Sequence, residues 1–464
     1  MGCRTDTIDN PSTDVNSPNE GETGKLSDLK RSLAYITSGA AGMFCGSCMH
    51  DNTLARALSQ MGVDIQLIPT YTPIRTDEDD VSIDRIFFGG VNVFLEQTVP
   101  MYRFLPSFFG RIFDQPWLIK KLTARSASVN PKSLGKLTIS MLRGTAGYQR
   151  REVLKLSTWL SHSVRPDLVV FSNILIAGCI PHLKRTLGTP ILVTLQGDDI
   201  FLESLPEPFR RQALDEIRRL VESVDGFLVH SQFYADRMGE YFGIPAEKLH
   251  LVPLGIDTRD FPTSLPEFDG TPADRPVAVG YLARLAKEKG LHVLVDAFIE
   301  LHKRPETKDV QLRVAGWMGE SNREYAASTF QKLDDAGLHD KYCYDGVVDR
   351  AGKVEFLKKL DLLSVPTTYE EPKGLFVLES LAAGVPVVQP NHGAFPELLD
   401  NMGGGCLVNP NDPLNLANQM HHLLCHPDQR RQLAEAGHAI VHSRFSAQAM
   451  AQGTWSVIEA LLND

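Results

Sequence analysis

From residue 33 onward, short apolar runs alternate with longer stretches in which apolar residues recur every three or four positions. The apolar runs of the first half predict strands at 33–37, 63–68, 167–172, 190–195 and 226–231. The stretches between them predict helices, for example at 50–62 and 207–224. This alternation is typical of a parallel sheet that is covered by helices on both faces.

The alternation stops over 259–276, where prolines recur at positions 262, 266, 272 and 276. It restarts with predicted strands at 277–282, 310–316, 361–366 and 385–389, helices from 291 and over 322–336, and a final helix over 446–462. We therefore predict an α/β protein with two doubly wound domains, 33–258 and 277–445, joined by a linker at 259–276. Ligands of such sheets bind beyond the carboxyl ends of the strands, which favours a site in the cleft between the domains.

Residues 1–32 differ from the rest because they are polar and contain no apolar run. We expect a disordered tail, since such a composition buries too little apolar surface to fold. The segment lacks the apolar core of a signal peptide. Met1-Gly2-Cys3 meets the acylation pattern only in part, because Asp6 stands where Ser or Thr is required. Nowhere does the chain reach the roughly 18 consecutive apolar residues of a membrane span.

The composition is that of an ordinary globular protein, with 43% hydrophobic and 22% charged residues in a chain of 464. The net charge of −10 argues against nucleic acid as a partner. The seven cysteines are scattered and odd in number, which predicts reduced thiols and a cytoplasmic protein. We interpret the lone C-x-x-C pair, Cys45 and Cys48, as packing or loop residues rather than as a metal or redox site.

The segment 280–298 places positive charge in front of a predicted helix. Arg284, Lys287 and Lys289 precede the helix that begins near Leu291. A helix N-terminus carries partial positive charge, so cations are unfavourable there unless an anion binds among them. One interpretation is a phosphate site made by the helix start and the basic side chains. The other is a solvated basic loop.

A second segment, "EEPKGLFVLESLAAGVPVVQP" at 370–390, combines a loop, a helix and a buried strand. Gly374 allows the backbone to approach a ligand closely, and the helix that follows offers free N–H groups to an anion. Glu379 lies five residues into the helix, about 7.5 Å along its axis, which suits the distance from a phosphate to a ribose. We hypothesise that Glu379 binds a ribose diol and that Glu371 binds sugar hydroxyls beyond the diphosphate. The alternative is a capped core helix that tolerates one glutamate.

Together these segments resemble the retaining glycosyltransferases of glycosyltransferase family four, over essentially the whole chain from residue 33. The E-x7-E pair Glu371 and Glu379, followed by "LAAGVPVV" and "NHGAFPELL", carries most of the resemblance. "GYLARLAKEKG" at 280–290 and "YFGIPAEKLHLVPLGID" at 241–257 add to it. The resemblance implies a GT-B fold, in which two Rossmann-like domains face a cleft. The acceptor would bind the first domain, the donor the second, and the last segment, 446–464, would cross back to the first.

The resemblance also implies roles for individual residues. Arg284 and Lys289 would contact the donor diphosphate, and Glu371 the transferred sugar; these are the expected catalytic residues. Backbone N–H groups at the start of the 375–383 helix would bind the donor, and "YDGVVD" at 344–349 would hold the nucleobase. The expected donor-binding residues are Gly46, Gly280, Val348, Lys373, Gly374, Leu375, Phe376 and Glu379.

Two positions depart from the family pattern. Lys373 stands where the family commonly has Phe, which adds a charge near the donor sugar. Gln196 stands where a histidine near the reacting carbon is usual, and glutamine cannot act as a base near neutral pH. Asp198 is a candidate substitute, although Asp after a strand is more often a turn former. His50 is a further candidate on the acceptor side, against the alternative of a surface histidine at a helix start.

The family implies transfer with retention of configuration. We find no secure carboxylate nucleophile under the sugar, so we favour a front-face reaction in which the departing phosphate takes the acceptor's proton. We expect neither a metal nor a cofactor, because cations and helix starts can stabilise the diphosphate. A metal-dependent enzyme of the GT-A class would use D-x-D, and Asp77-Glu78-Asp79 fits those letters. We interpret that run as a solvated acidic loop.

Three other functions were weighed. A GT-B-fold nucleotide-sugar epimerase would bind the same donor without needing an acceptor. A catalytically inactive nucleotide-sugar-binding protein is an alternative that Gln196 keeps open. A dinucleotide oxidoreductase would need G-x-G-x-x-G after the first strand, and "SGAAGMFCG" at 38–46 does not supply it.

The stretch 101–151 is basic and aromatic, with ten Lys and Arg positions against Asp114, and Phe104, Phe108, Phe109, Phe113 and Trp117 between them. One interpretation is peripheral contact with an anionic membrane, which would place the protein at the inner face and fit a lipid-linked acceptor. We favour the other, a helical insertion packed on the sheet with a solvated basic face. Neither interpretation identifies the acceptor, which we expect to be an unknown glycan or lipid.

Overall fold

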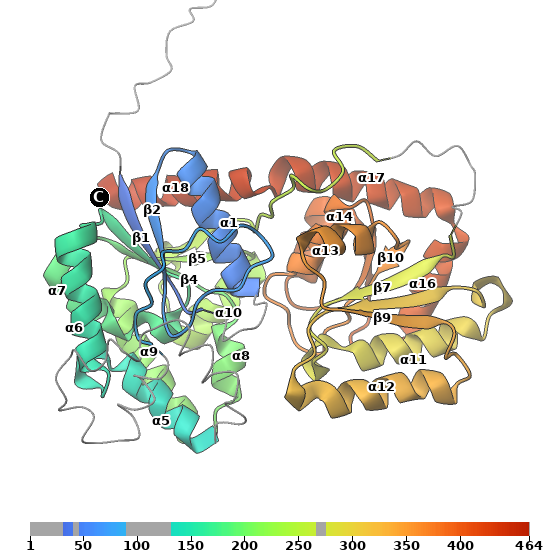
Figure 1. Ribbon diagram of the computed structural model, residues 1–464, viewed down its shortest axis with the longest axis horizontal. Helices are drawn as coiled ribbons and strands as arrows, with labels where there is room; N and C mark the ends of the chain where they lie inside the picture. Colours follow the sequence, from blue (N-terminus) through green and yellow to red (C-terminus); the bar gives the residue numbers. More distant parts are fainter. Residues whose placement is uncertain (1–30, 40–45, 90–130, 266–274, 464) are drawn as a thin grey trace, which may run out of the picture. The chain divides into compact units, whose positions relative to one another are not determined.

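The computed structural model describes residues 31–39, 46–89, 131–265 and 275–463 (Figure 1). Cys45, the part of the basic stretch before residue 131 and residues 266–274 of the predicted linker lie outside these residues. So does the predicted tail except for its last two residues, and Ser32 already begins the first strand.

The first half forms a six-stranded sheet in the order β2-β1-β3-β4-β5-β6, and every pairing in it is parallel. Its strands are β1 (Ser32–Thr37), β2 (Asp64–Pro69), β3 (Leu168–Phe171), β4 (Ile191–Thr194), β5 (Gly226–Val229) and β6 (Leu249–Leu251). Five correspond to predicted strands. The sixth, β6, is a three-residue edge strand that is partly exposed, so its sequence has no apolar run.

Alternate residues of each strand enter different cores, as both faces of a parallel sheet are covered. Leu33 and Tyr35 pack in the core that includes α1 and α18, whereas Ala34 and Ile36 pack in the core on the opposite face. The helices of this half are α1 (Gly46–Gln60), α5 (Pro131–Leu142), α6 (Arg150–Trp159), α7 (Ile180–Leu187), α8 (Asp198–Glu203), α9 (Phe209–Ser223) and α10 (Gln232–Phe242), with α18 (Ala447–Asn463) joining from the end of the chain.

The second half forms another six-stranded parallel sheet, in the order β12-β11-β10-β7-β8-β9. Its strands are β7 (Ala278–Leu282), β8 (Gln311–Ala315), β9 (Tyr342–Gly346), β10 (Leu362–Leu363), β11 (Val387–Pro390) and β12 (Gly405–Val408). The edge strands β9 and β12 were not predicted. Residues 344–346 of the expected nucleobase loop therefore belong to β9, and only 347–349 form the loop.

Helices cover both faces of the second sheet. Figure 1 shows α11 (Leu291–His302) and α12 (Arg323–Asp335) on one face, and α13 (Arg350–Leu357), α14 (Leu375–Ala382) and α17 (Pro427–Arg444) on the other. The remaining helices are α15 (Phe395–Met402) and α16 (Pro413–Cys425). Two doubly wound parallel sheets are the α/β architecture that the resemblance implies.

Two segments of the chain pass between the halves, and they lie side by side. Ile256 pairs with Ser446, just after the first sheet ends and just before α18 begins. The two segments approach so closely that an added Cβ at Gly255 would lie 2.3 Å from the Ser446 carbonyl oxygen. Beyond this point α18 packs against α1. Within the described part of the chain, no helix is both long and apolar enough to span a membrane.

Candidate active site

The site is built around the start of α14, at the carboxyl end of the second sheet. Gly374 caps this helix with φ +67°, a left-handed conformation that favours glycine. An added Cβ there would lie 2.8 Å from Leu398 Cδ1, so a side chain would strain the backbone and displace Leu398. Leu375 and Phe376 follow as the first helical residues, whose N–H groups have no partner within the helix.

Glu371 lies beside this helix start as a buried carboxylate. Its Oε2 atom accepts hydrogen bonds from Lys289 Nζ, at 2.6 Å, and from the Tyr369 hydroxyl, while the Gly374 N–H is 3.5 Å from Oε1. Burial alone would raise the pKa of Glu371. The charges of Lys289 and Lys373 and the two side-chain hydrogen bonds outweigh it, so the pKa is lowered and the carboxylate is ionised.

Lys289 contacts Glu371 directly, whereas Arg284 acts through its charge on the neighbouring Tyr369. Lys289 is 14% exposed, and its ammonium lies 4.9 Å from the centre of the Tyr369 ring and 5.8 Å from that of Phe376. Arg284 instead pairs with Glu288 at 3.1 Å, and both side chains are more than a third exposed. The basic segment is therefore solvated in part, at Arg284, and buried in the site in part, at Lys289. Neither of the two interpretations describes it fully.

Lys373 extends from the second half to the first. Its Nζ atom donates to Gln196 Oε1 at 2.9 Å and lies 3.4 Å from Ser47 Oγ in the first turn of α1. Gln196 Nε2 in turn donates to Asp51 Oδ1 at 2.9 Å and to the Ser172 carbonyl at 2.8 Å, which fixes the amide with its oxygen toward the ammonium. The two positions that depart from the family pattern are thus in direct contact.

Asp51 is a buried residue that the sequence analysis missed. It also accepts hydrogen bonds from Tyr35 at 2.9 Å and from Thr37 at 2.6 Å, on the strand that precedes α1. No local signal marked it, because Asp51 stands among the polar residues His50, Asn52 and Thr53 at the start of the predicted helix.

His50 is buried rather than at the surface. Its Nδ1 atom is 3.2 Å from Asp51 Oδ1, and its ring centre is 4.6 Å from that of His230, whose Nδ1 faces the Val252 carbonyl. In the part of the chain that the structure describes, the Nε2 atoms of both imidazoles are buried without a hydrogen-bond partner. Burial lowers the pKa of each, and for His230 the charges of His50 and Lys373 add to the effect, so both rings are neutral.

Asp198 serves the turn before α8. Its Oδ1 accepts the Ile174 N–H at 2.9 Å and its Oδ2 the Gln196 N–H at 2.9 Å. Burial raises the pKa of Asp198 to about 6. With both oxygens engaged by backbone donors, this carboxylate holds the turn that carries Gln196.

The remaining expected donor residues differ in position. Gly46 is the exposed first residue of α1, next to Ser47, and an added Cβ there would meet nothing within 4 Å. Gly280 is buried in the middle of β7, where an added Cβ would lie 2.1 Å from Leu360 Cδ1, so it packs the sheet and is not brought to the site. Val348 is half-buried in the loop between β9 and α13.

Glu379 is buried on α14 and pairs with Lys353 of α13, whose Nζ lies 2.5 Å from Glu379 Oε1. The same ammonium lies 2.6 Å from Asp77 Oδ2. The interpretation of the 77–79 run as a solvated loop is therefore wrong for its first two side chains. Asp77 is 2% exposed and Glu78 5%, because cations from distant segments pair with them; Asp79 is exposed.

Arginines complete this charged cluster. Glu78 pairs with Arg56 at 2.5 Å and with Arg350 at 3.6 Å, and Arg56 also reaches Asp257 at 2.6 Å. Within the described ranges, no group of three or more His, Cys, Asp or Glu side chains is placed to hold a metal ion.

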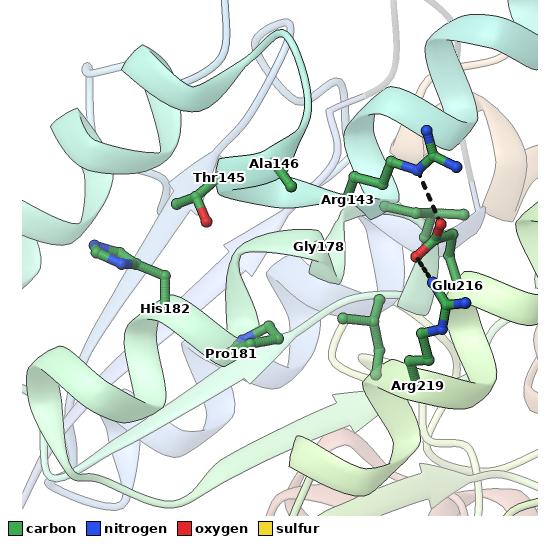
Figure 2. A pocket seen from close by; sticks show the side chains of 10 residues that line it. Arg143, Thr145, Ala146, Gly178, Pro181, His182, Glu216 and Arg219 are labelled. Carbon is green, nitrogen blue, oxygen red and sulfur yellow. Dashed lines mark hydrogen bonds and ion pairs between the residues drawn. The ribbon is translucent and has the colours of Figure 1, made fainter.

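A cavity of about 510 Å³ lies elsewhere, between α7, α9 and the turn Gly144–Ala146 (Figure 2). Glu216 joins Arg143 and Arg219 at one end of it, and His182 lies at the other. None of the expected site residues lines this cavity, so it carries no part of the candidate site.

Two protein-family models match the chain. Residues 267–439 match the model described as Glycosyl transferases group 1, and residues 136–260 match that described as Glycosyltransferase Family 4. Lys289, Lys353 and the 371–379 segment fall in the first match, and Gln196 in the second.

Similar curated proteins include the D-inositol 3-phosphate glycosyltransferase of Segniliparus rotundus, 26% identical over 72% of this chain and 72% of the relative. The glycogen synthase of Mycobacterium tuberculosis is 26% identical over 65% of this chain and 70% of its own length. Among solved structures, sucrose-phosphate synthase from Thermosynechococcus elongatus has a TM-score of 0.67 at 18% identity, covering 93% of this chain and 100% of that one. HepE of Anabaena, in complex with UDP, has a TM-score of 0.65 at 15% identity, covering 92% and 100%. At these identities the structures establish the fold.

Proposed function

This chain belongs to the GT-B glycosyltransferases of the family-four type, and from this premise we propose that it transfers a sugar from a nucleotide-diphosphate sugar to an acceptor hydroxyl, with retention of configuration. The acceptor is a glycan or lipid hydroxyl of unknown identity. A nucleotide-sugar donor also fits action in the cytoplasm, and the 101–151 stretch would provide any contact with the inner face of a membrane.

One observation carries the proposal: Glu371 lies within hydrogen-bond distance of both Lys289 and the capped start of α14. The ammonium and the free helix N–H groups bind a diphosphate, since both concentrate positive charge at one place. The ionised Glu371 carboxylate accepts hydrogen bonds from hydroxyls of the transferred sugar. In this proposal Glu379, further along α14, binds the ribose.

In the proposed front-face step, the bond from the sugar's reacting carbon to the phosphate oxygen breaks as a bond to the acceptor oxygen forms on the same face. The departing phosphate oxygen takes the acceptor's proton, so no side-chain base is needed. This assignment agrees with the geometry of Asp198, whose oxygens are engaged, and with the neutral amide of Gln196. Lys289 and Lys373 stabilise the charge that develops on the leaving group, and the proposal calls for no cofactor or metal.

The test begins with thermal unfolding in the presence of UDP-, GDP- and ADP-sugars. A donor at 100 times its dissociation constant stabilises the folded protein by about 2.7 kcal/mol. Transfer from the donor so identified is then measured for Lys289→Ala and Glu371→Gln, with the exposed Lys287→Ala as the control. We expect both site variants to lose on the order of 100-fold in transfer while they remain folded. Full activity in either variant would refute the site assignment.

A further inference from the structure

The loop after β2 contributes a buried carboxylate to the nucleotide side of the site. Asp77 Oδ2 lies 2.6 Å from Lys353 Nζ, which lies 2.5 Å from Glu379 Oε1. Lys353 is 8% exposed, Asp77 2% and Glu379 6%. One ammonium therefore stands between two buried carboxylates, one from each half of the chain.

This arrangement leaves hydrogen-bond acceptors in excess. Glu78 and Asp257 have guanidinium groups of their own, from Arg56, Arg350 and Arg259. Lys353 in contrast is shared by Asp77 and Glu379. The second oxygen of Asp77, Oδ1, is buried and has no hydrogen-bond partner among the described residues. An unsatisfied buried acceptor is costly, so this oxygen calls for a donor.

The chemistry of the missing group follows from the charge. A further anion is unfavourable here, because it would lie against the carboxylates of Asp77 and Glu379, whose charges are already balanced by Lys353 and by the nearby Arg350. A metal ion would need further ligands that the described residues do not offer. A neutral group with two adjacent O–H donors satisfies one oxygen of each carboxylate, and a vicinal diol is such a group.

We propose that Asp77 and Glu379 together bind the ribose diol of the donor nucleotide, one hydroxyl each, while Lys353 holds the two carboxylates in register. This inference rests on the proposed function, since it needs a nucleotide whose phosphates lie at the start of α14. Glu379 is five residues beyond Gly374, about 7.5 Å along the helix, which places the carboxylate pair one ribose away from those phosphates. The nucleotide then contacts both halves of the chain.

The test compares ribonucleotides with their deoxy counterparts. Dissociation constants are measured by calorimetry for UDP, GDP and ADP, and then for the 2′-deoxy and 3′-deoxy forms of whichever binds. The proteins are the wild type, Asp77→Ala, Glu379→Gln and the control Asp79→Ala, whose side chain is exposed. Asp77→Ala leaves Lys353 paired with Glu379, so the variant should fold; thermal unfolding checks this, and Asp77→Asn gives the same comparison should it not.

We expect the wild type to prefer the ribonucleotide by about tenfold or more over each deoxy form, as is typical of a lost hydrogen bond to a charged group. Asp77→Ala should abolish the preference over one deoxy form and keep the preference over the other. Glu379→Gln should do the reverse, and Asp79→Ala should match the wild type. A merely structural Asp77 would weaken all three ligands equally.

The outcomes separate the two proposals. Should the wild type bind a ribonucleotide and Asp77→Ala retain both preferences, Asp77 is not a ribose ligand, and the proposed transferase function stands. Should no nucleotide bind the wild-type protein, both proposals fail together.

Discussion

Replacing Lys373 by methionine is the sharpest perturbation of the site. Methionine keeps the length and most of the volume of the buried stem, and removes the ammonium that donates to Gln196 at 2.9 Å. Loss of that charge-assisted hydrogen bond costs about 1.5–3 kcal/mol. Removing a buried charge relieves its desolvation and offsets much of this. The free energy of unfolding should therefore change by no more than about 2 kcal/mol.

The effect on the reaction should be larger. Lys373 joins α1 of the first half to the loop that carries Glu371, where charge develops on the leaving phosphate. A unit charge about 5 Å from that phosphate, at an effective dielectric constant near 20, contributes about 3 kcal/mol, or on the order of 100-fold in rate. We predict a loss of this size for Lys373→Met, and a much smaller one for Lys373→Arg, which keeps the charge.

The assay is nucleotide release from the donor that the thermal-shift panel identifies, with kcat and KM measured separately and urea unfolding as the stability check. A rate for Lys373→Met within threefold of the wild type, in a folded protein that binds donor, would refute the idea that this ammonium acts on the reacting centre. The idea would also be refuted if the rate of Lys373→Met fell only in proportion to its loss of stability.

Two further predictions concern the backbone and pH. Gly374→Ala should destabilise the protein by about 1–2 kcal/mol in urea unfolding and weaken donor binding, because φ is +67° and the new Cβ would lie 2.8 Å from Leu398. Gly337→Ala, at φ +73° in open space, is the control; it should cost stability alone, and an equal loss of donor binding would contradict the reasoning. The pKa values of His50 and His230 are lowered from 6.5, chiefly by burial, so the folded state binds fewer protons than the unfolded chain. Their contribution to stability is complete above the ordinary histidine pKa and is lost as the pH falls below it. His230→Gln should therefore flatten the decline in unfolding free energy between about pH 7 and 5. If the unfolding free energies of the variant and the wild type fell in parallel with pH, a role for the His230 ring would be excluded.

The parts of the fold that were predicted are those in which local sequence and burial agree. The central strands β3 and β4 are buried at every position, so their apolar runs stand out. The edge strands β6 and β9 have partly exposed positions throughout, and β9 carries Tyr342 and Asp345, so no apolar run marks them. Their pairing to a neighbour decides their conformation, and a single segment does not reveal that pairing.

The same division applies to the site. Lys289, Glu371 and Gly374 were found because each lies in a short segment with helix-start chemistry. Asp51 was missed because its role depends on Gln196, 145 positions away in the sequence. Asp77 was misinterpreted because an acidic run in a polar segment normally faces water, and only the fold brings Lys353 to it.

The contacts between the halves at the site are polar, and this has a consequence for ligand binding. Gln196 meets Lys373 beside Glu371, the proposed sugar ligand, and Asp77 meets Lys353 beside Glu379, the proposed ribose ligand. A donor that reaches both places makes its interactions only while the halves are together, so its binding free energy favours that arrangement over any separated one. By linkage, weakening either polar contact should lower donor affinity, even where the substituted side chain does not touch the donor.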